Sequence, residues 1–238
     1  MITLNSDAAS TSLSKTTKAI LNEYGIKLNK NLGQNYLIDR NKRDQIIQFG
    51  NLTKDDVVLE IGPGIGTLTI ELAKRVKKVI AIEQDSNICQ ILENRLKKEN
   101  IDNVELINDD ALNVEFPKFD KIISNLPYQI SSPITFKFLN YDFQLAILMY
   151  QKEFASRMNG KVGSKNYSRL SAMLYFKCDV DLLTGVSAES FIPKPKVDST
   201  VVRLTPKLPE LNGQLKHLNI NEINEKDFKT YSKFVKAL

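Results

Sequence analysis

A short run of polar and aromatic residues follows an apolar, strand-like segment at 121–124. The run reads Asn125-Leu126-Pro127-Tyr128. Pro127 has no N–H and stiffens the turn, so neighbouring carbonyl groups can point outward, and Asn125 adds a side-chain acceptor. Outward acceptors beside the flat ring of Tyr128 suit an adenine that has been taken out of its stack, because its amino group and its face are both contacted. A plain turn of the type Asn-x-Pro-Tyr is the alternative.

A glycine-rich loop stands between a predicted strand at 57–61 and a predicted helix. It places Gly62, Gly64 and Gly66 directly after Glu60-Ile61. Glycines allow a tight turn and a close approach of the backbone to a ligand. The spacing differs from that of dinucleotide-binding loops, whose third glycine comes one residue later, and nothing resembles a P-loop. The loop therefore favours a nucleoside cofactor that lacks phosphates.

Carboxylates follow the next two predicted strands. Glu83 ends the second strand, where a carboxylate can accept hydrogen bonds from both ribose hydroxyls. Asp110, in the run Asp109-Asp110-Ala111 after the third strand, could accept from an adenine amino group. A solvated acid at a strand end is the alternative for Glu83. S-adenosylmethionine is the cofactor that combines these demands.

Alternating apolar and amphipathic segments predict the elements that position these residues. Apolar, β-branched runs predict strands at 57–61, 79–83, 104–107, 121–124 and 145–149. Helical spacing of apolar residues predicts helices at 67–75 and 87–98. Alternating units of this length imply right-handed crossovers and a parallel sheet covered on both faces. Ligands of such Rossmann-like sheets bind outside the carboxyl ends of the strands.

Composition excludes several classes of protein. Hydrophobic residues make up 42% and charged residues 26%, which are ordinary globular proportions, and no apolar run reaches the length of a membrane span. The two cysteines, Cys89 and Cys178, lie far apart, and His217 is the single histidine, so we expect no zinc site, no disulfide framework and no triad hydrolase. The net charge of +5 is compatible with a polyanionic partner and does not demonstrate one.

The two ends of the chain differ from its middle. Residues 1–27 have neither an apolar signal region nor an arginine-rich presequence, and we expect a cytoplasmic protein with a loosely ordered N-terminal extension. A Rossmann-like domain is expected at 28–206. Residues 207–238 read as a linker and then the start of a C-terminal helical lobe, whose apolar face includes Phe228 and Tyr231. This face continues to the chain end without a cap, so the sequence predicts an incomplete lobe.

Five separated motifs occur together in this chain, in a fixed order. They are 31–37 (Asn-Leu-Gly-Gln-Asn-Tyr-Leu), 60–64 (Glu-Ile-Gly-Pro-Gly), 125–128 (Asn-Leu-Pro-Tyr), 150–153 (Tyr-Gln-Lys-Glu) and 191–197 (Phe-Ile-Pro-Lys-Pro-Lys-Val). With these motifs the chain resembles the ribosomal RNA adenine N6,N6-dimethyltransferase family, in particular its small-subunit enzymes. The resemblance covers about 28–206, and the local sequence is closer to the archaeal branch.

The resemblance implies a fold, an activity and partners. The fold would be a Rossmann-like, class I S-adenosylmethionine-dependent methyltransferase with a small C-terminal helical lobe that binds RNA. The activity would be dimethylation of two adjacent adenosines near the 3′ end of small-subunit rRNA, within an immature small ribosomal subunit, by a monomer that needs neither a metal nor a membrane. A large-subunit enzyme of the antibiotic-resistance type is one alternative. A non-catalytic assembly or transcription factor is another, which intact Glu83 and Asn125 argue against.

The resemblance also implies roles for single residues. Asn35 and Leu37 would contact the methionine end of the cofactor, with Gly62 and Gly64 lying against it. The full set implied to bind the cofactor is Asn35, Leu37, Gly62, Gly64, Glu83, Asp110 and Asn125. In the catalytic segment, Asn125 and the adjoining backbone of Leu126 and Pro127 would hold the target amino group. Tyr128 and Phe191 would sandwich the target base.

Overall fold

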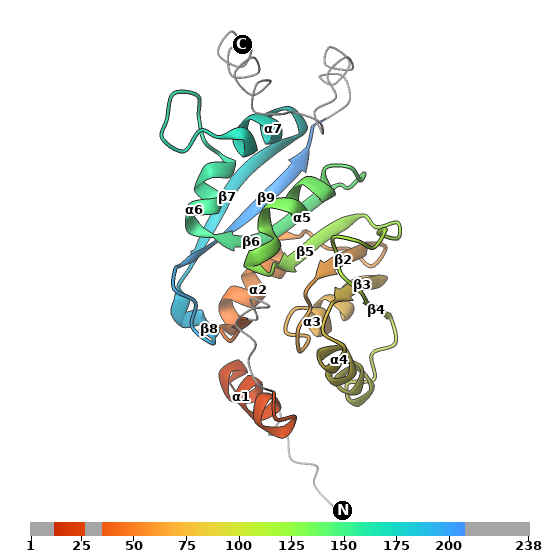
Figure 1. The fold of residues 1–238 in the computed structure, drawn as a ribbon. Coiled ribbons are helices and arrows are strands. Elements are labelled where there is room, and N and C mark those ends of the chain that lie inside the picture. Colours follow the sequence, from red (N-terminus) through yellow and green to blue (C-terminus); the bar gives the residue numbers. More distant parts are fainter. Residues whose placement is uncertain (1–11, 27–34, 208–238) are drawn as a thin grey trace, which may run out of the picture.

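A seven-stranded sheet forms the centre of the molecule in a computed structural model, which describes residues 12–26 and 35–207 (Figure 1). The strand order is β4-β3-β2-β5-β6-β9-β7. Five strands are parallel: β2 (Val57–Ile61), β3 (Lys78–Glu83), β4 (Val104–Asn108), β5 (Lys121–Asn125) and β6 (Leu145–Gln151). These strands agree with the predicted ones to within two residues at each end.

Two further strands extend one edge of the sheet. β9 (Ser199–Pro206) pairs antiparallel with β6, and β7 (Cys178–Val186) pairs antiparallel with β9. The sheet is thus mostly parallel, as the sequence predicts, and its antiparallel pairing is confined to this edge. The chain passes from β6 through two helices to β7 and then returns as β9 between β6 and β7. β9 therefore runs opposite to the other six strands of this sheet.

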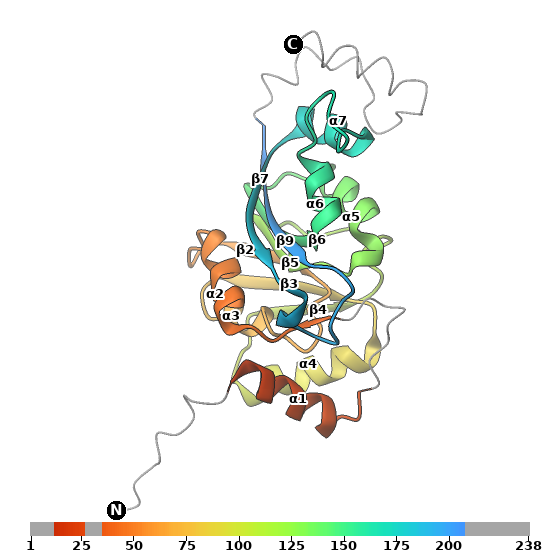
Figure 2. The same ribbon diagram turned by 90° about the vertical axis from the view of Figure 1, so that its left-hand side faces the viewer.

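Helices cover both faces of the sheet, as Figure 2 shows. One face is covered by α2 (Arg40–Phe49), α3 (Thr69–Ala73) and α4 (Ser86–Lys98), and the other by α5 (Ser131–Phe138), α6 (Lys152–Met158) and α7 (Arg169–Lys177). Successive strand residues alternate between the two cores: Val58 packs with α2 and α3, whereas Leu59 packs in the cluster that contains α5, α6 and α7. This alternation explains why the strands are mostly apolar on both faces, with the buried Glu60 of β2 as an exception.

Two small elements lie at the carboxyl ends of the parallel strands. The short strands β1 (Tyr36–Leu37) and β8 (Phe191–Ile192) form an antiparallel pair. Helix α1 (Leu13–Glu23) is capped by Ser12, which accepts a hydrogen bond from the Lys15 N–H at 3.3 Å. Ile20 and Leu21 of α1 are buried with residues of α4 and β1, so part of the segment expected to be loosely ordered is a packed helix.

Two other findings concern only the described residues. No helix among them is long and apolar enough to cross a membrane, and no group of three or more His, Cys, Asp or Glu residues among them could hold a metal ion. The predicted C-terminal lobe falls, except for Lys207, outside the residues that the structure describes.

Candidate functional site

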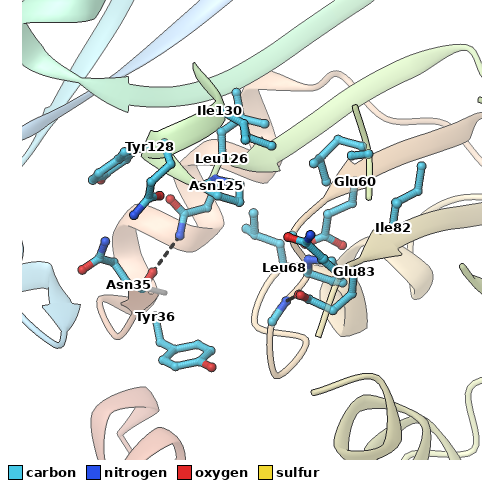
Figure 3. A pocket seen from close by; sticks show the side chains of 18 of the residues that line it. Asn35, Tyr36, Glu60, Leu68, Ile82, Glu83, Asn125, Leu126, Tyr128 and Ile130 are labelled. Atoms are coloured by element: carbon cyan, nitrogen blue, oxygen red, sulfur yellow. Dashed lines mark hydrogen bonds between the residues drawn. The ribbon is translucent and has the colours of Figure 1, made fainter. Parts of the chain in front are cut away.

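A pocket opens at the carboxyl ends of the parallel strands, where the sequence places its candidate residues (Figure 3). The strand register brings these ends together: Ile61 pairs with Ile82, and the Gly62 N–H donates to the carbonyl of Ile82 at 2.9 Å. Ten of the eleven residues predicted for the site line the pocket: Asn35, Leu37, Gly62, Gly64, Glu83, Asp110, Asn125, Leu126, Pro127 and Tyr128. The fold therefore gathers both predicted subsites into one cavity.

The glycine-rich loop lies against the catalytic segment and against β1. Gly62 has φ +67°, and a Cβ there would stand 3.0 Å from the side chain of Pro127. Gly64 has φ +55°, and its Cβ would stand 2.9 Å from the ring of Tyr36. Both positions combine a left-handed backbone with a close approach, so only glycine fits without displacement. These contacts fix the backbone of the loop where both glycines line the pocket.

Glu83 holds the tip of this loop. Its Oε2 accepts from the Gly64 N–H at 3.2 Å, and its Oε1 accepts from the Asp85 N–H at 3.0 Å. Burial raises the pKa of the carboxyl group, although these two backbone donors favour its ionised form. Each oxygen keeps a second lone pair, so the carboxylate can still accept from the hydroxyls of a ribose.

Two buried polar groups of the pocket were not assigned a role from the sequence. Glu60 is 2% exposed and its Oε2 lacks a hydrogen-bond partner within the described residues. The hydroxyl of Tyr36 is likewise buried without a partner there, and burial, with Glu83 and Asp85 nearby, raises its pKa. Unpaired buried polar atoms are rare, and in a pocket wall they point to a polar ligand. The sequence signals for these two residues are the position of Glu60 two residues before Gly62 and the place of Tyr36 in the motif 31–37.

Glu60 gives the folded protein a distinctive dependence on pH. Burial, partly opposed by the nearby Thr69 hydroxyl and reinforced by Glu83, raises its pKa to about 8 from an ordinary value of 4.5. Between these two values the folded protein holds a proton that the unfolded chain has lost, so the free energy of unfolding falls as pH rises. We expect Glu60→Gln, which cannot ionise, to be more stable than the parent at pH 8.5 by about 1–3 kcal/mol.

Urea unfolding of both proteins at pH 6 and pH 8.5 measures this difference. The parent should lose more stability than Glu60→Gln between the two pH values. Equal losses would show that Glu60 ionises in the folded protein as it does in water.

The side chain of Asn125 is fixed by a segment far away in the sequence. Asn125 ends β5, and its amide Nδ2 donates to the carbonyl of Asn35 at 3.0 Å, as the dashed line in Figure 3 shows. This bond orients the amide and leaves Oδ1 as the acceptor that a ligand amino group could meet. The backbone at Asn35 therefore helps to shape the part of the pocket that contains Asn125.

Tyr128 lies at the pocket, whereas Phe191 lies in the hydrophobic core. Tyr128 begins a single 3₁₀ turn after Pro127, lines the pocket, and its hydroxyl lies 2.6 Å from Oγ of Ser199. Phe191 is 2% exposed and packs in the core with Leu37 and Val186. A ring in that position cannot stack on a base in the pocket, so the expected sandwich between Tyr128 and Phe191 is not formed in this structure.

Asp110 lines the opposite end of the pocket within a tightly bonded loop. Its Oδ1 accepts from the Leu112 N–H at 2.9 Å and its Oδ2 from Asn113 Nδ2 at 3.1 Å. Lys137 of α5, which the sequence did not single out, donates from Nζ to the carbonyls of Ala111 and Val114 in the same loop. The loop that carries Asp110 is thus tied to the helix that follows the catalytic segment.

Comparisons with known proteins agree with this site. Residues 25–237 match the family model described as "Ribosomal RNA adenine dimethylase". The chain is 54% identical to the "Probable ribosomal RNA small subunit methyltransferase A" of Methanosphaera stadtmanae over 80% of this chain and 70% of that protein. It is 53% identical to the protein of the same name from Methanothermobacter thermautotrophicus, over 80% of this chain and 68% of that one.

Solved structures share the fold. A dimethyladenosine transferase from Plasmodium falciparum has a TM-score of 0.71 at 41% identity, covering 78% of this chain. The chain spans 66% of the length of that protein. The 23S rRNA methyltransferase ErmE has a TM-score of 0.69 at 30% identity, covering 85% of this chain and 78% of that one.

These matches confirm the Rossmann-like methyltransferase fold. They also confirm the resemblance that the five motifs indicate, including its closeness to archaeal sequences. Because the family model matches most of the length of this chain, the chain belongs to the ribosomal RNA adenine dimethylase family.

Proposed function

We propose that this protein uses S-adenosylmethionine to dimethylate N6 of two adjacent adenosines near the 3′ end of small-subunit rRNA, within an immature small ribosomal subunit. The observation that carries the proposal is the single pocket that joins the glycine-rich loop, Glu83 and the segment Asn125–Tyr128. Relatives about half identical to this chain, named as small-subunit methyltransferases, support the choice of RNA. A monomer acting in the cytoplasm is part of the proposal.

The residues of the pocket suit S-adenosylmethionine. Gly62 and Gly64 bring the loop backbone against Pro127 and Tyr36, with no space there for a Cβ. Both glycines line the pocket together with Glu60 and Tyr36, which carry the unpaired polar atoms. Glu83 would hold the ribose, and the loop that carries Asp110 would hold the adenine. When bound, this cofactor supplies an electrophilic methyl group on a positively charged sulfur.

Asn125 would prepare the target nitrogen for attack. The lone pair of an adenine amino group is delocalised into the ring, which makes the nitrogen a weak nucleophile. Accepting one amino hydrogen on Oδ1 of Asn125 and the other on a backbone carbonyl of 126–127 favours the pyramidal, nucleophilic geometry. Because Nδ2 is already bonded to Asn35, the amide is preorganised and does not turn during the reaction.

Positioning supplies the remaining part of the rate enhancement. Near neutral pH the amino nitrogen is uncharged, so its lone pair could attack before any proton is lost, and no general base is required at that stage. The methyl group would leave its sulfur as the new N–C bond forms, and the methylated nitrogen would then release one proton to solvent. Tyr128 would cover one face of the extruded adenine and hold its amino group in line with the methyl group. Addition of the second methyl group requires the monomethylated amine to stay in the pocket or to return to it.

Large-subunit RNA is the second candidate substrate. The similarity to ErmE, a 23S rRNA methyltransferase, favours it, since 30% identity accompanies a TM-score of 0.69. The pocket residues named above select an adenine and a cofactor, and they do not select between two RNAs. That choice depends on surfaces outside the pocket.

Labelled methyl transfer to three substrates separates the candidates. Immature small subunits, protein-free small-subunit RNA and large-subunit RNA are incubated with the protein side by side. Asn125→Ala provides the background. We expect transfer to the small-subunit substrates well above that background and none to large-subunit RNA. Transfer mainly to large-subunit RNA would overturn the proposed substrate, and no transfer to any of them would overturn the proposed activity.

A further inference from the structure

A hydrogen bond at the far end of the Tyr128 ring connects the pocket to the sheet. The hydroxyl of Tyr128 lies 2.6 Å from Oγ of Ser199, and Ser199 is 1% exposed. Ser199 does not line the pocket itself. Its contact with the pocket passes through Tyr128.

The position of Ser199 is set by two neighbouring strands. Ser199 is the first residue of β9 and pairs with Gln151 of β6 on one side and Val186 of β7 on the other. Asp198, just before it, accepts from the Ala188 N–H through Oδ1 at 2.9 Å and from the Lys152 N–H through its carbonyl at 3.0 Å. The hydroxyl of Ser199 is therefore held by the framework rather than by a loop.

The backbone around Tyr128 is held by fewer elements of secondary structure than that of Ser199. It follows Pro127 and begins a single 3₁₀ turn, and its side chain is half-buried at the pocket wall. The backbone fixes one end of the side chain, and the ring can still rotate about its two side-chain torsions. A bond to the hydroxyl fixes the other end and hence the tilt of the ring face toward the pocket.

We propose that Ser199 is a positioning residue, which holds the ring of Tyr128 at the tilt required to stack on the target adenine. This inference rests on the proposed function. It assigns a role in the reaction to the segment that runs from Phe191 to Ser199, through a serine at its end rather than through the phenylalanine at its start. The bond acts on the bound base, so its loss should affect RNA turnover and leave cofactor binding unchanged.

A double-mutant cycle tests the inference. Ser199→Ala should lower kcat/KM for the RNA substrate by about three- to tenfold, the factor that corresponds to one neutral hydrogen bond. Tyr128→Phe, which removes the same bond from the other side, should have an effect of the same size. Ser199→Ala made in the Tyr128→Phe protein should then cause no further loss, because the bond is already absent. Calorimetry should give the same S-adenosylmethionine affinity for all four proteins.

A direct probe of stacking accompanies the kinetics. The fluorescent base 2-aminopurine replaces the target adenine in the RNA. Its fluorescence is quenched when the base stacks on an aromatic ring. We expect the 2-aminopurine fluorescence of the bound RNA to be less quenched with Ser199→Ala than with the parent protein. A purely structural role for Ser199 would not change this signal at matched RNA occupancy.

A matched control comes from a second pair of hydroxyls in the core. Thr135 Oγ1 lies 2.7 Å from the hydroxyl of Tyr150, and both residues are fully buried and do not line the pocket. Thr135→Val should lower the melting temperature and leave kcat/KM per folded molecule unchanged.

The outcomes separate this inference from the proposed function. Ser199→Ala could lower kcat/KM equally in the parent and in the Tyr128→Phe protein, or lower it in neither. Either result, with an active parent enzyme, would overturn the positioning role. If Ser199→Ala does not fold, Tyr128→Phe alone decides, and an unchanged kcat/KM in that variant overturns the inference. A parent protein that methylates none of the RNAs refutes the proposed function instead.

Discussion

Replacing Asn125 with alanine is expected to lower the rate of methyl transfer by at least about a hundredfold, the usual cost of removing one preorganised polar group from a transition state. The loss has this size because the amide is already oriented by its bond to the Asn35 carbonyl and meets the amino group as it becomes pyramidal. RNA affinity should fall much less, since most of that affinity comes from phosphate contacts outside the pocket. Single-turnover kinetics and filter binding measure the two quantities.

Asn125→Asp is the informative companion variant. It keeps an oxygen acceptor and loses the N–H that donates to Asn35, so a carboxylate oxygen would face a carbonyl oxygen and the side chain would turn away. We expect transfer to be nearly as low as in Asn125→Ala. If binding and transfer fell in equal proportion in either variant, Asn125 would be a docking residue and the mechanism would be wrong.

Removal of the Glu83 carboxylate should weaken S-adenosylmethionine binding at least about tenfold. Each charge-assisted hydrogen bond to a ribose hydroxyl contributes about 1.5–3 kcal/mol. The structure adds a second reason, because Glu83→Ala also frees the N–H of Gly64, which Glu83 now holds at 3.2 Å. The loop tip would lose its anchor at the place where it contacts the ligand.

Calorimetry with Glu83→Ala and two comparison variants measures this effect. Glu83→Gln keeps one acceptor and should bind with intermediate affinity. Glu105→Ala on β4 removes a carboxylate that is paired with Lys78 outside the pocket, and its affinity should equal that of the parent. Unchanged affinity in Glu83→Ala, with the fold retained, would refute the assignment of Glu83 to the ribose.

The parallel part of the sheet could be predicted because its strands are buried on both faces. A continuous apolar run such as residues 145–149 of β6 has few alternative structures. Strand β7 could not be predicted in the same way. It lies at the edge of the sheet, carries exposed Asp179 and Asp181, and is interrupted by an irregularity between Leu182 and Thr184. Its position follows from pairing with β9, which no local pattern encodes.

In the candidate site, likewise, some residues could be predicted from the sequence and others could not. Glu83 and Asn125 could be predicted, because each ends a recognisable strand and the carboxyl ends of parallel strands meet at one edge. Their supporting contacts could not. Asn35 lies 90 residues from Asn125 along the chain, and Ser199 lies 71 residues from Tyr128. Spacing within one sequence carries no information about such pairs.

The burial of Phe191 illustrates the same limit. Its motif led to the expectation that its ring faces the target base, yet pairing of β8 with β1 places it beside Leu37 in the core. The motif 191–197 positions the entry to β9, where Ser199 contacts Tyr128.

We infer that one pocket transfers methyl groups from S-adenosylmethionine to the amino nitrogens of two neighbouring adenosines. Mass spectrometry of the 3′-terminal fragment of small-subunit RNA, after reaction of immature subunits with the protein and this cofactor, tests it most directly. We expect two methyl groups on the base of each of two adjacent adenosines, and far fewer at the same reaction time when Asn125→Ala replaces the parent. Methyl groups on a ribose, on another base, or at undiminished level with Asn125→Ala would contradict it.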